Sequence, residues 1–141
     1  MPLLGQVLEH YPKQVKVVFK NFPLSMHEFA APAALAAMAA HKQGKFWPYH
    51  DKLFANSSSL SEKKFQEIAA ELKLNKAQFE ADRKDPAVEA IVNRDQQDGL
   101  KAEVPGVPSV FINGRLLKDR SLQGIRDLIN KQLQKASQPL Q

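Results

Sequence analysis

The stretch from Val104 to Gly114, VPGVPSVFING, limits the possible fold more than any other part of the chain. Pro105 and Pro108 each fix φ at about −65° and push the preceding residue out of the helical region, so the backbone enters this stretch extended. Asn113 and Gly114 form the strongest two-residue signal for a type I′ hairpin turn. We therefore predict a rigid turn followed by an antiparallel hairpin. The predicted strands are residues 109–112 and 115–118.

The length and composition are typical of one globular domain with a sizeable core. The chain has 141 residues, of which 43% are hydrophobic and 25% charged. Its net charge is +5, and the lysines are scattered among acidic residues, so we expect a solvated surface and no nucleic-acid partner. No run approaches the ~20 apolar residues of a membrane span, so we expect no membrane partner. The sequence shows no export signal of its own.

The chain contains no cysteine, which excludes a disulfide, a thiolate nucleophile and a thiolate metal site within it. His27, His41 and His50 have spacings that match no compact metal site, so we expect no metal ion and no cofactor. Ser57–Ser59 lacks the glycines of a nucleophile elbow and is predicted to be a loop. The acidic residues at 82, 85, 95 and 98 are predicted to lie on helix surfaces or at caps rather than to form an acid–base pair.

Hydrophobic periodicity predicts helices at both ends of the chain and between residues 25 and 103. Apolar residues at 4, 7, 8 and 11 mark a first helix ending before Pro12, and a last helix begins at Ser121. Val15–Phe19 is a continuous β-branched and aromatic run, predicted to be a central strand buried on both faces. The middle block is predicted to contain four or five helices. Its predicted N-caps are Ser59 or Ser61, Asn75 and Asp85, and its aromatic residues 46, 47, 49 and 54 are predicted to be core.

This order of elements, with a proline just before the first hairpin strand, resembles the thioredoxin fold with a helical insertion, as in the DsbA-like thiol:disulfide oxidoreductases. Four stretches carry the resemblance: residues 17–24 followed by His27, residues 43–47 with Leu53 and Phe54, residues 72–75 with Phe79, and residues 106–114. Each stretch alone is weak evidence for the resemblance, but the four together occur in the same order as in the family. The resemblance implies an α/β, thioredoxin-like fold. It divides a single domain, residues 1–141, into a thioredoxin portion, 1–24 and 104–136, and a helical insertion, 25–103.

The resemblance also implies a substrate site. Pro108 is similar to the family's cis-proline, and Val107 to the residue before it, whose backbone pairs with an extended peptide. The expected partner is therefore an extended peptide or protein substrate. Family membership implies an exported, usually periplasmic location, whereas the missing export signal leaves a cytoplasmic location open.

The chain departs from the family pattern at its start. The family's first strand and its Cys-x-x-Cys motif are expected just upstream of Pro2, so we expect no catalytic residue here. Because disulfide exchange requires a thiolate, this chain is predicted to be inactive. Two interpretations stay open: the start is internal to a longer enzyme, or the chain is a non-catalytic peptide-binding or self-associating scaffold.

Absence of the family's first strand has a structural consequence. The predicted strand at Val15–Phe19 and the first hairpin strand would each have an open edge, and exposed edges recruit other chains. We therefore expect either a homodimer, through exchanged elements or edge pairing, or direct pairing of these two strands.

Overall fold

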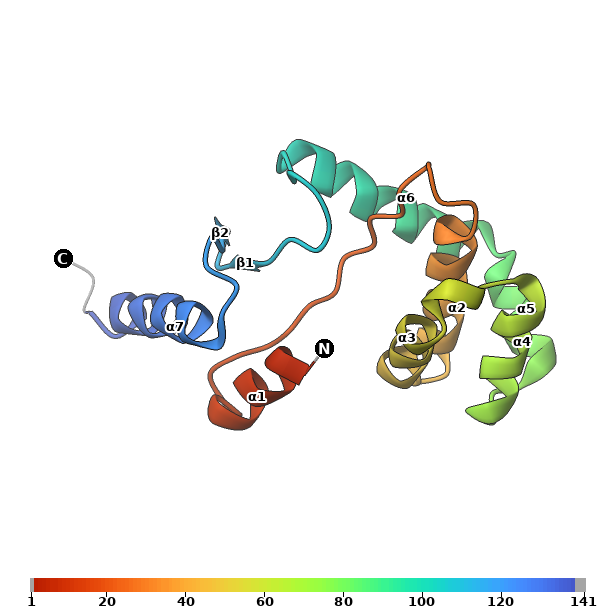
Figure 1. Cartoon of the computed structure of the whole chain (residues 1–141), viewed down its shortest axis with the longest axis horizontal. Helices are drawn as coiled ribbons and strands as arrows, with labels where there is room; N and C mark the ends of the chain where they lie inside the picture. Colours follow the sequence, from red (N-terminus) through yellow and green to blue (C-terminus); the bar gives the residue numbers. More distant parts are fainter. Residues whose placement is uncertain (1, 139–141) are drawn as a thin grey trace. The chain divides into compact units, whose positions relative to one another are not determined.

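The computed structural model describes residues 2–138, which form two compact units (Figure 1). The hairpin unit consists of residues 2–19 and 104–138, and the helical unit of residues 20–103. The hairpin unit contains α1 (Pro2–His10), β1 (Phe111–Ile112), β2 (Arg115–Leu116) and α7 (Leu122–Ala136). The helical unit contains α2 (Ala30–Lys42), α3 (Phe46–Ala55), the 3-10 turn η1 (Ser57–Ser59), α4 (Glu62–Glu71), α5 (Lys76–Arg83) and α6 (Pro86–Lys101).

The predicted hairpin is confirmed. β1 and β2 are antiparallel, with Phe111 opposite Leu116 and Ile112 opposite Arg115. The turn residues have φ values of 48° at Asn113 and 76° at Gly114, the positive values at both positions that a type I′ turn requires. Beyond the two-residue strands, the backbone N–H of Leu117 donates to the carbonyl oxygen of Val110 at 2.8 Å, which extends the pairing by one residue.

A small apolar core holds the hairpin unit together. α1 contributes the buried side chains of Val7 and Tyr11, and α7 contributes those of Ile125 and Ile129. Leu117, which follows β2, is buried in the same cluster. The hydroxyl of Tyr11 also donates to Oδ1 of Asn130 at 2.8 Å. The two predicted terminal helices are therefore confirmed and pack against the hairpin.

The predicted central strand at Val15–Phe19 is wrong. These residues have no regular secondary structure, and among residues 2–138 the sheet consists of β1 and β2 alone. Val15 packs against the core of the hairpin unit, but the side chain of Val18 is 64% exposed. A β-forming run becomes a strand only where a neighbouring strand pairs with its backbone, and no described residue supplies that neighbour. The expected direct pairing with the first hairpin strand is therefore also absent from the described residues.

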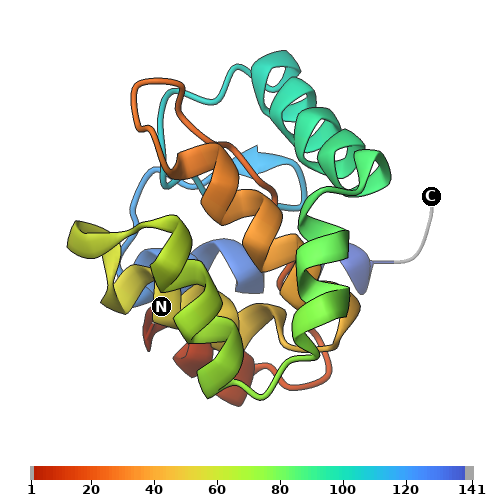
Figure 2. The ribbon, with the colours of Figure 1, turned by 90° about the vertical axis from the view of Figure 1, so that its right-hand side faces the viewer.

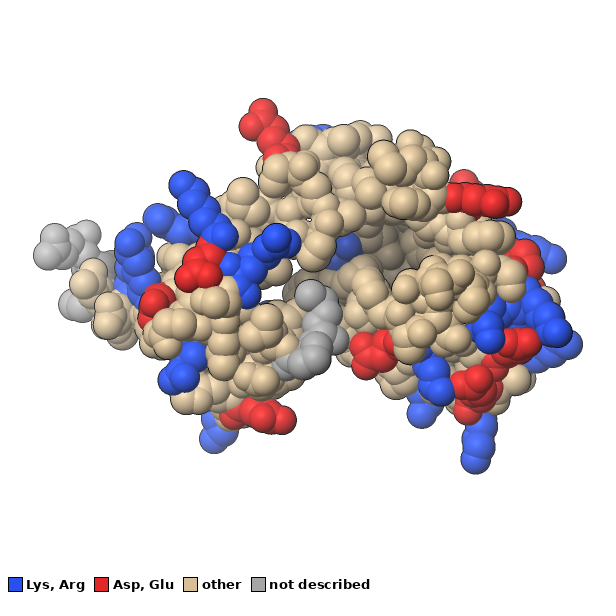
Figure 3. Space-filling model, in the orientation of Figure 1, with Lys and Arg blue, Asp and Glu red and all other residues tan. Residues whose placement is uncertain are grey.

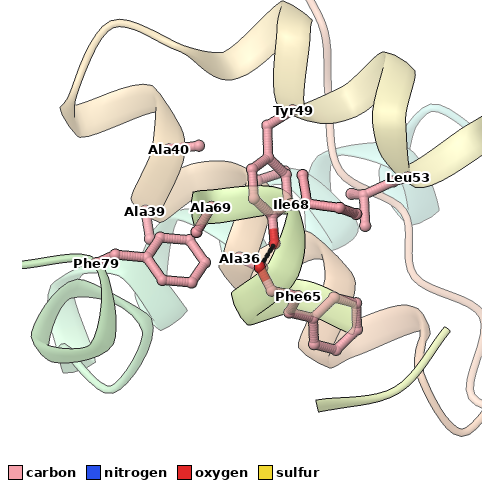
Figure 4. Close-up of a cluster of buried hydrophobic side chains, with 10 residues drawn as sticks. Ala36, Ala39, Ala40, Tyr49, Leu53, Phe65, Ile68, Ala69 and Phe79 are labelled. Atoms are coloured by element: carbon pink, nitrogen blue, oxygen red, sulfur yellow. Dashed lines mark hydrogen bonds between the residues drawn. The ribbon is translucent and has the colours of Figure 1, made fainter. Parts of the chain in front are cut away.

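Small side chains let the helices of the helical unit approach closely. α2 contacts α3, α4, α5 and α6, and its buried residues are all alanine: Ala36, Ala37, Ala39 and Ala40 (Figure 2). Tyr49 and Phe65 are fully buried beside them, and the Tyr49 hydroxyl donates to the carbonyl oxygen of Phe65 at 2.9 Å (Figure 4). Tyr49 therefore supplies a large ring to the core without leaving a buried hydroxyl unpaired.

Four helices begin at N-caps that the sequence predicts. In each, a side-chain oxygen accepts a hydrogen bond from a backbone N–H of the first turn, which satisfies one of the unpaired donors at a helix start. The caps are Ser61 for α4, Asn75 for α5, Asp85 for α6 and Ser121 for α7. α2 begins at Ala30, and α6 continues through Gly99 to Lys101.

Two predictions about burial in the helical unit are wrong. Trp47 is 42% and Phe54 65% exposed, although both were predicted to be core. Conversely, Asp82 and Asp95 are buried, although both were predicted to lie at the surface or at caps. Each buried carboxylate is compensated by hydrogen bonds: Asp82 to Lys42, and Asp95 to Lys20 and Asn21. Hydrophobic periodicity does not reveal such acids, because their burial depends on partners far away in the sequence.

Among the helices at residues 2–138, none is long and apolar enough to cross a lipid bilayer.

Candidate functional site at the Val107–Pro108 corner

The two site residues predicted from the sequence lie together at an exposed corner of the hairpin unit. The peptide bond between Val107 and Pro108 is cis. The side chain of Val107 is 47% exposed, and Pro108 is exposed as well. Three residues further on the chain enters β1, so a packed hairpin carries the corner.

Two hydrogen bonds within the hairpin unit hold the corner. The hydroxyl of Ser109 donates to the carbonyl oxygen of Gly106 at 2.6 Å and so closes a tight turn around the cis peptide. The Nη1 atom of Arg120 donates to the carbonyl oxygen of Pro108 at 3.2 Å. Arg120 precedes α7, so the corner is tied both to its own turn and to the segment that leads into the last helix.

The backbone of Val107 is available to a ligand. Among residues 2–138, neither its N–H nor its C=O is hydrogen-bonded to another residue. Unpaired backbone groups of this kind can form the main-chain hydrogen bonds that hold an added peptide strand, whereas neighbouring side chains select its sequence. The corner can therefore pair with extended backbone.

The segment that carries Arg120 is fixed by its neighbours. Oδ1 of Asp119 accepts a hydrogen bond from the backbone N–H of Ser121 at 2.9 Å. This N–H, together with the Ser121 hydroxyl, lowers the pKa of Asp119 below its usual value of 3.8. Asp119 also lies so close to Gly124 that a β-carbon there would overlap with its carbonyl oxygen and side chain. Position 124 thus requires glycine for reasons of space. The close packing of Asp119 against Gly124 fixes the backbone position of Asp119 and so of the adjacent Arg120.

Sequence reasoning did not single out Arg120 as a site residue. Three cations, Arg115, Lys118 and Arg120, occur within six residues directly after the hairpin turn, and all three are exposed. That local cluster was the available signal. It is hidden in the total charge of the chain, because acidic residues elsewhere are almost as numerous as the basic ones.

The histidines considered as metal ligands do not come together at a metal site. His41 and His50 each make an aromatic contact with Phe46, and His50 contacts Trp47 and Phe54 as well. His27 lies in the turn before α2, where its N–H donates to the carbonyl oxygen of Leu24. Within residues 2–138, no group of three or more His, Asp or Glu side chains is placed to hold a metal ion.

A hollow of about 380 Å³ lies in the helical unit and is lined in part by Glu62, Glu80 and Arg83. Three of its charged groups already have partners. The guanidinium of Arg83 pairs with both glutamates and lies over the rings of Phe65 and Phe79. Burial disfavours the charged guanidinium, but the two glutamates more than offset this and raise the pKa of Arg83. These residues stabilise the packing of α4 against α5, so we do not assign a ligand to this hollow.

The thioredoxin family model matches residues 2–131, which is most of the chain. The chain belongs to the thioredoxin family. Its fold class is thioredoxin-like, mostly helical with a small two-stranded sheet, and the implied relationship to DsbA-like thiol–disulfide oxidoreductases is confirmed. The Val107–Pro108 corner is therefore a feature of a thioredoxin-family protein whose printed sequence contains no cysteine.

Two kinds of curated relative match. The chain is 33% identical over 109 residues to the Na(+)/H(+) antiporter NhaA of Herminiimonas arsenicoxydans, in an alignment that covers 77% of this chain and 17% of the antiporter. It is 29% identical over 131 residues to the Probable disulfide bond formation protein D of Bacillus cereus, covering 86% of this chain and 60% of that protein. The chain thus spans about a sixth of the antiporter and three fifths of the disulfide protein.

Solved structures support the same fold. A thioredoxin-like oxidoreductase from Silicibacter pomeroyi is 26% identical, with a TM-score of 0.79 over 97% of this chain and 78% of that one. The thiol-disulfide exchange protein alpha-DsbA2 from Wolbachia pipientis is 18% identical, with a TM-score of 0.81 over 93% of this chain and 72% of that one. The second likeness shows the shared fold alone.

Proposed function

We propose that this chain is a peptide-binding member of the DsbA-like oxidoreductase family that holds extended peptide segments at the Val107–Pro108 corner and has no disulfide-exchange activity of its own. The observation that carries the proposal is the unpaired backbone of Val107, a residue that is 47% exposed, beside Pro108. Support also comes from a Proteus mirabilis DsbA solved with a non-covalently bound peptide, which shares the fold at a TM-score of 0.74 and 16% identity.

The proposed inactivity follows from chemistry. Thiol–disulfide exchange proceeds by attack of a thiolate on a disulfide sulfur, and the printed sequence has no cysteine to supply that thiolate. An insulin-reduction assay with the purified chain should therefore show no rate above the reductant alone. Turnover by the cysteine-free chain would overturn this part of the proposal.

Peptide binding at the corner can be tested with N-methylated peptides. Each backbone hydrogen bond contributes about 0.5 to 1.5 kcal/mol, so methylating the one peptide nitrogen that pairs with the Val107 carbonyl should weaken binding about 2- to 10-fold. Methylation of the neighbouring nitrogens, which point away in an extended strand, is the matched control. Equal effects at every position would argue against strand addition.

Two protein variants give an independent test. Pro108→Ala frees φ at the corner and should weaken binding of the same peptide, because the corner must then be ordered on binding. Pro105→Ala makes the same chemical change three residues upstream, away from the unpaired Val107 backbone, and should leave the affinity unchanged. Unchanged affinity in Pro108→Ala would count against the corner as the peptide site.

A second candidate function is self-association, which the exposed hairpin favours. Among the described residues, β1 and β2 pair only with each other, so each has an open outer edge, and Phe111 and Leu116 are about 40% exposed on them. Open edges with apolar side chains promote pairing between chains. Light scattering of the purified chain should then give the mass of a dimer, and Leu116→Lys should shift it to the monomer mass. A monomer at all concentrations would dismiss this candidate.

We also propose an exported, oxidising location, supported by the general periplasmic location of DsbA-like proteins. Detection of the native protein in the cytoplasmic fraction alone would contradict it.

A further inference from the structure

The net charge of the chain is carried entirely by the hairpin unit. Residues 1–19 and 104–141 contain eight Lys and Arg against three Asp and Glu, a net charge of +5, whereas the helical unit contains twelve of each. Figure 3 shows Lys and Arg side chains gathered over the hairpin unit with a few Asp and Glu side chains among them, and both signs intermixed over the helical unit. The lysines are scattered along the sequence, but the net positive charge belongs to one of the two units.

The basic side chains in the described part of the hairpin unit form no ion pair with an acidic residue. Within residues 2–138, no Lys or Arg of this unit forms an ion pair with an Asp or Glu, whereas Lys42, Lys52 and Arg83 of the helical unit each do. Two of the unit's three acids are engaged by neutral groups: Asp119 by the N–H of Ser121 and Asp127 by the side-chain amide of Gln123. The positive charge is thus uncompensated within the structure.

Three of these cations lie on the segment that returns from the hairpin turn toward the Val107–Pro108 corner, Arg115 opposite Ile112 and Arg120 against Pro108; we call Arg115, Lys118 and Arg120 the basic rim. All three are exposed. Arg120 donates directly to the carbonyl oxygen of Pro108, which fixes a permanent positive charge one residue from the unpaired Val107 backbone. Lys118 follows Leu117, whose N–H is bonded to Val110, so the rim runs back alongside the chain that leaves the corner.

We propose that the basic rim makes the corner selective for extended peptides that carry Asp or Glu close to the residue paired with Val107. This inference rests on the proposed peptide-binding function and names its substrate class. A carboxylate of the peptide accepts charge-assisted hydrogen bonds from the guanidinium of Arg120, whose planar fork suits that geometry. The other rim cations raise the local potential and so the rate of encounter with acidic segments.

Fluorescence anisotropy with the full chain tests the selectivity. Three labelled peptides of one length and backbone register carry Glu, Gln or Lys at the two positions beside the central residue. Two to three exposed ion pairs should make the Glu peptide bind about 3- to 30-fold more tightly than the Gln peptide, with the Lys peptide weakest. Screening by added salt should shrink this difference, because the Debye length falls from about 10 Å at 0.1 M to about 3 Å at 1 M.

Arg120→Gln is the decisive variant, since glutamine keeps a side-chain donor for the Pro108 carbonyl but loses the charge. It should reduce the Glu-over-Gln preference about 2- to 5-fold, while Arg120→Lys should retain most of it. Lys131→Gln, an exposed position on α7, is the matched control with the same loss of net charge. An equal reduction of the Glu-over-Gln preference in Arg120→Gln and Lys131→Gln would show that net charge alone causes the preference, and would overturn the proposed role of the basic rim.

Failure of this inference is distinguishable from failure of the proposed function. Equal binding of the Glu and Gln peptides would overturn the rim and leave peptide binding in place, whereas no binding of any peptide would overturn both. Two other anionic ligands serve as rivals: a single-stranded oligodeoxynucleotide, and vesicles of phosphatidylcholine with phosphatidylserine. Tighter binding of either rival than of the Glu peptide, with the same loss in Arg120→Gln, would assign the rim to that ligand and overturn the proposal.

Discussion

Several cations of the helical unit form ion pairs with acids of the same unit, whereas no Lys or Arg in the described part of the hairpin unit pairs with an Asp or Glu. Residues 20–103 contain equal numbers of cations and anions, some of which form ion pairs such as Lys42 with Asp82, and the core is built from alanines and large rings. The hairpin unit has a smaller core and an uncompensated charge of +5. The contrast indicates that charge in the helical unit serves packing, and that charge in the hairpin unit is available for a ligand.

Core truncation in the helical unit should produce the largest effect. Phe65 is fully buried, and Phe65→Ala should lower the stability of this unit by about 3 to 5 kcal/mol through lost burial and a cavity. Hydrogen exchange should show the loss at amides of α4 and α2. Phe54→Ala, the same change at a 65% exposed side chain, should cost far less. If amides of α7 lost protection equally with those of α4, the two units would unfold as one and the comparison would break.

A pair of helical glycines tests the tighter packing at the base of α7. Gly124→Ala forces a β-carbon against Asp119 and should destabilise the chain by about 1 to 3 kcal/mol. Gly5→Ala in α1 has open space around it and should stabilise the chain by about 0.5 to 1 kcal/mol, because alanine is the better helix former. Denaturant unfolding measures both. If both substitutions stabilised the chain, the segment around Asp119 would have to move aside without cost. Arg120 would then not be held in a fixed position.

Acid titration should affect the two units through different carboxylates. Lys42, followed by Gln78, lowers the pKa of Asp82 below 3.8, so its stabilising contribution is complete above that value and is lost as the pH falls through the lower folded-state pKa. Asp82→Asn should therefore flatten the loss of protection in the helical unit below pH about 4. Asp119→Asn, whose pKa is lowered by Ser121, should do the same for α7 alone. The same pH dependence of protection in both units for the two variants would contradict the expectation that Asp82 and Asp119 stabilise different units.

Surface cations should give the smallest effect. Lys52 lies 2.6 Å from Glu71, and Lys52→Gln should cost at most about 1 kcal/mol, as is typical of exposed pairs. Lys131→Gln in the hairpin unit removes an unpaired cation and should leave the stability unchanged or slightly raised, since repulsion among like charges falls. Thermal unfolding at low salt measures both. A clear loss of stability in Lys131→Gln would reveal a stabilising role for the charge in the hairpin unit.

The hairpin turn and the helix N-caps could be predicted from the sequence, because each depends on neighbouring residues only. The Asn113–Gly114 turn and the caps at Ser61, Asn75 and Asp85 depend on residues within three positions, and all are confirmed. The strand at Val15–Phe19 required a pairing partner that no described residue provides, so β propensity alone misled.

Burial and charge were harder to predict, because both depend on contacts across the sequence. Asp82 is buried because Lys42 reaches it from another helix, and Phe54 is exposed although it lies one position from the core residue Leu53. The corner itself was identified from Val107 and Pro108, but its association with Arg120 was not. That contact joins residues twelve positions apart and becomes visible only when the hairpin folds back.

The buried Asp95 links the entrance of the helical unit to its exit. It accepts hydrogen bonds from the backbone and side chain of Asn21, while Gln96 donates to the carbonyl oxygen of Pro23. Asp95 lies six residues, or about 9 Å of helix, before α6 ends at Lys101. The first residues of the helical unit are therefore anchored to its last helix by hydrogen bonds formed within this unit.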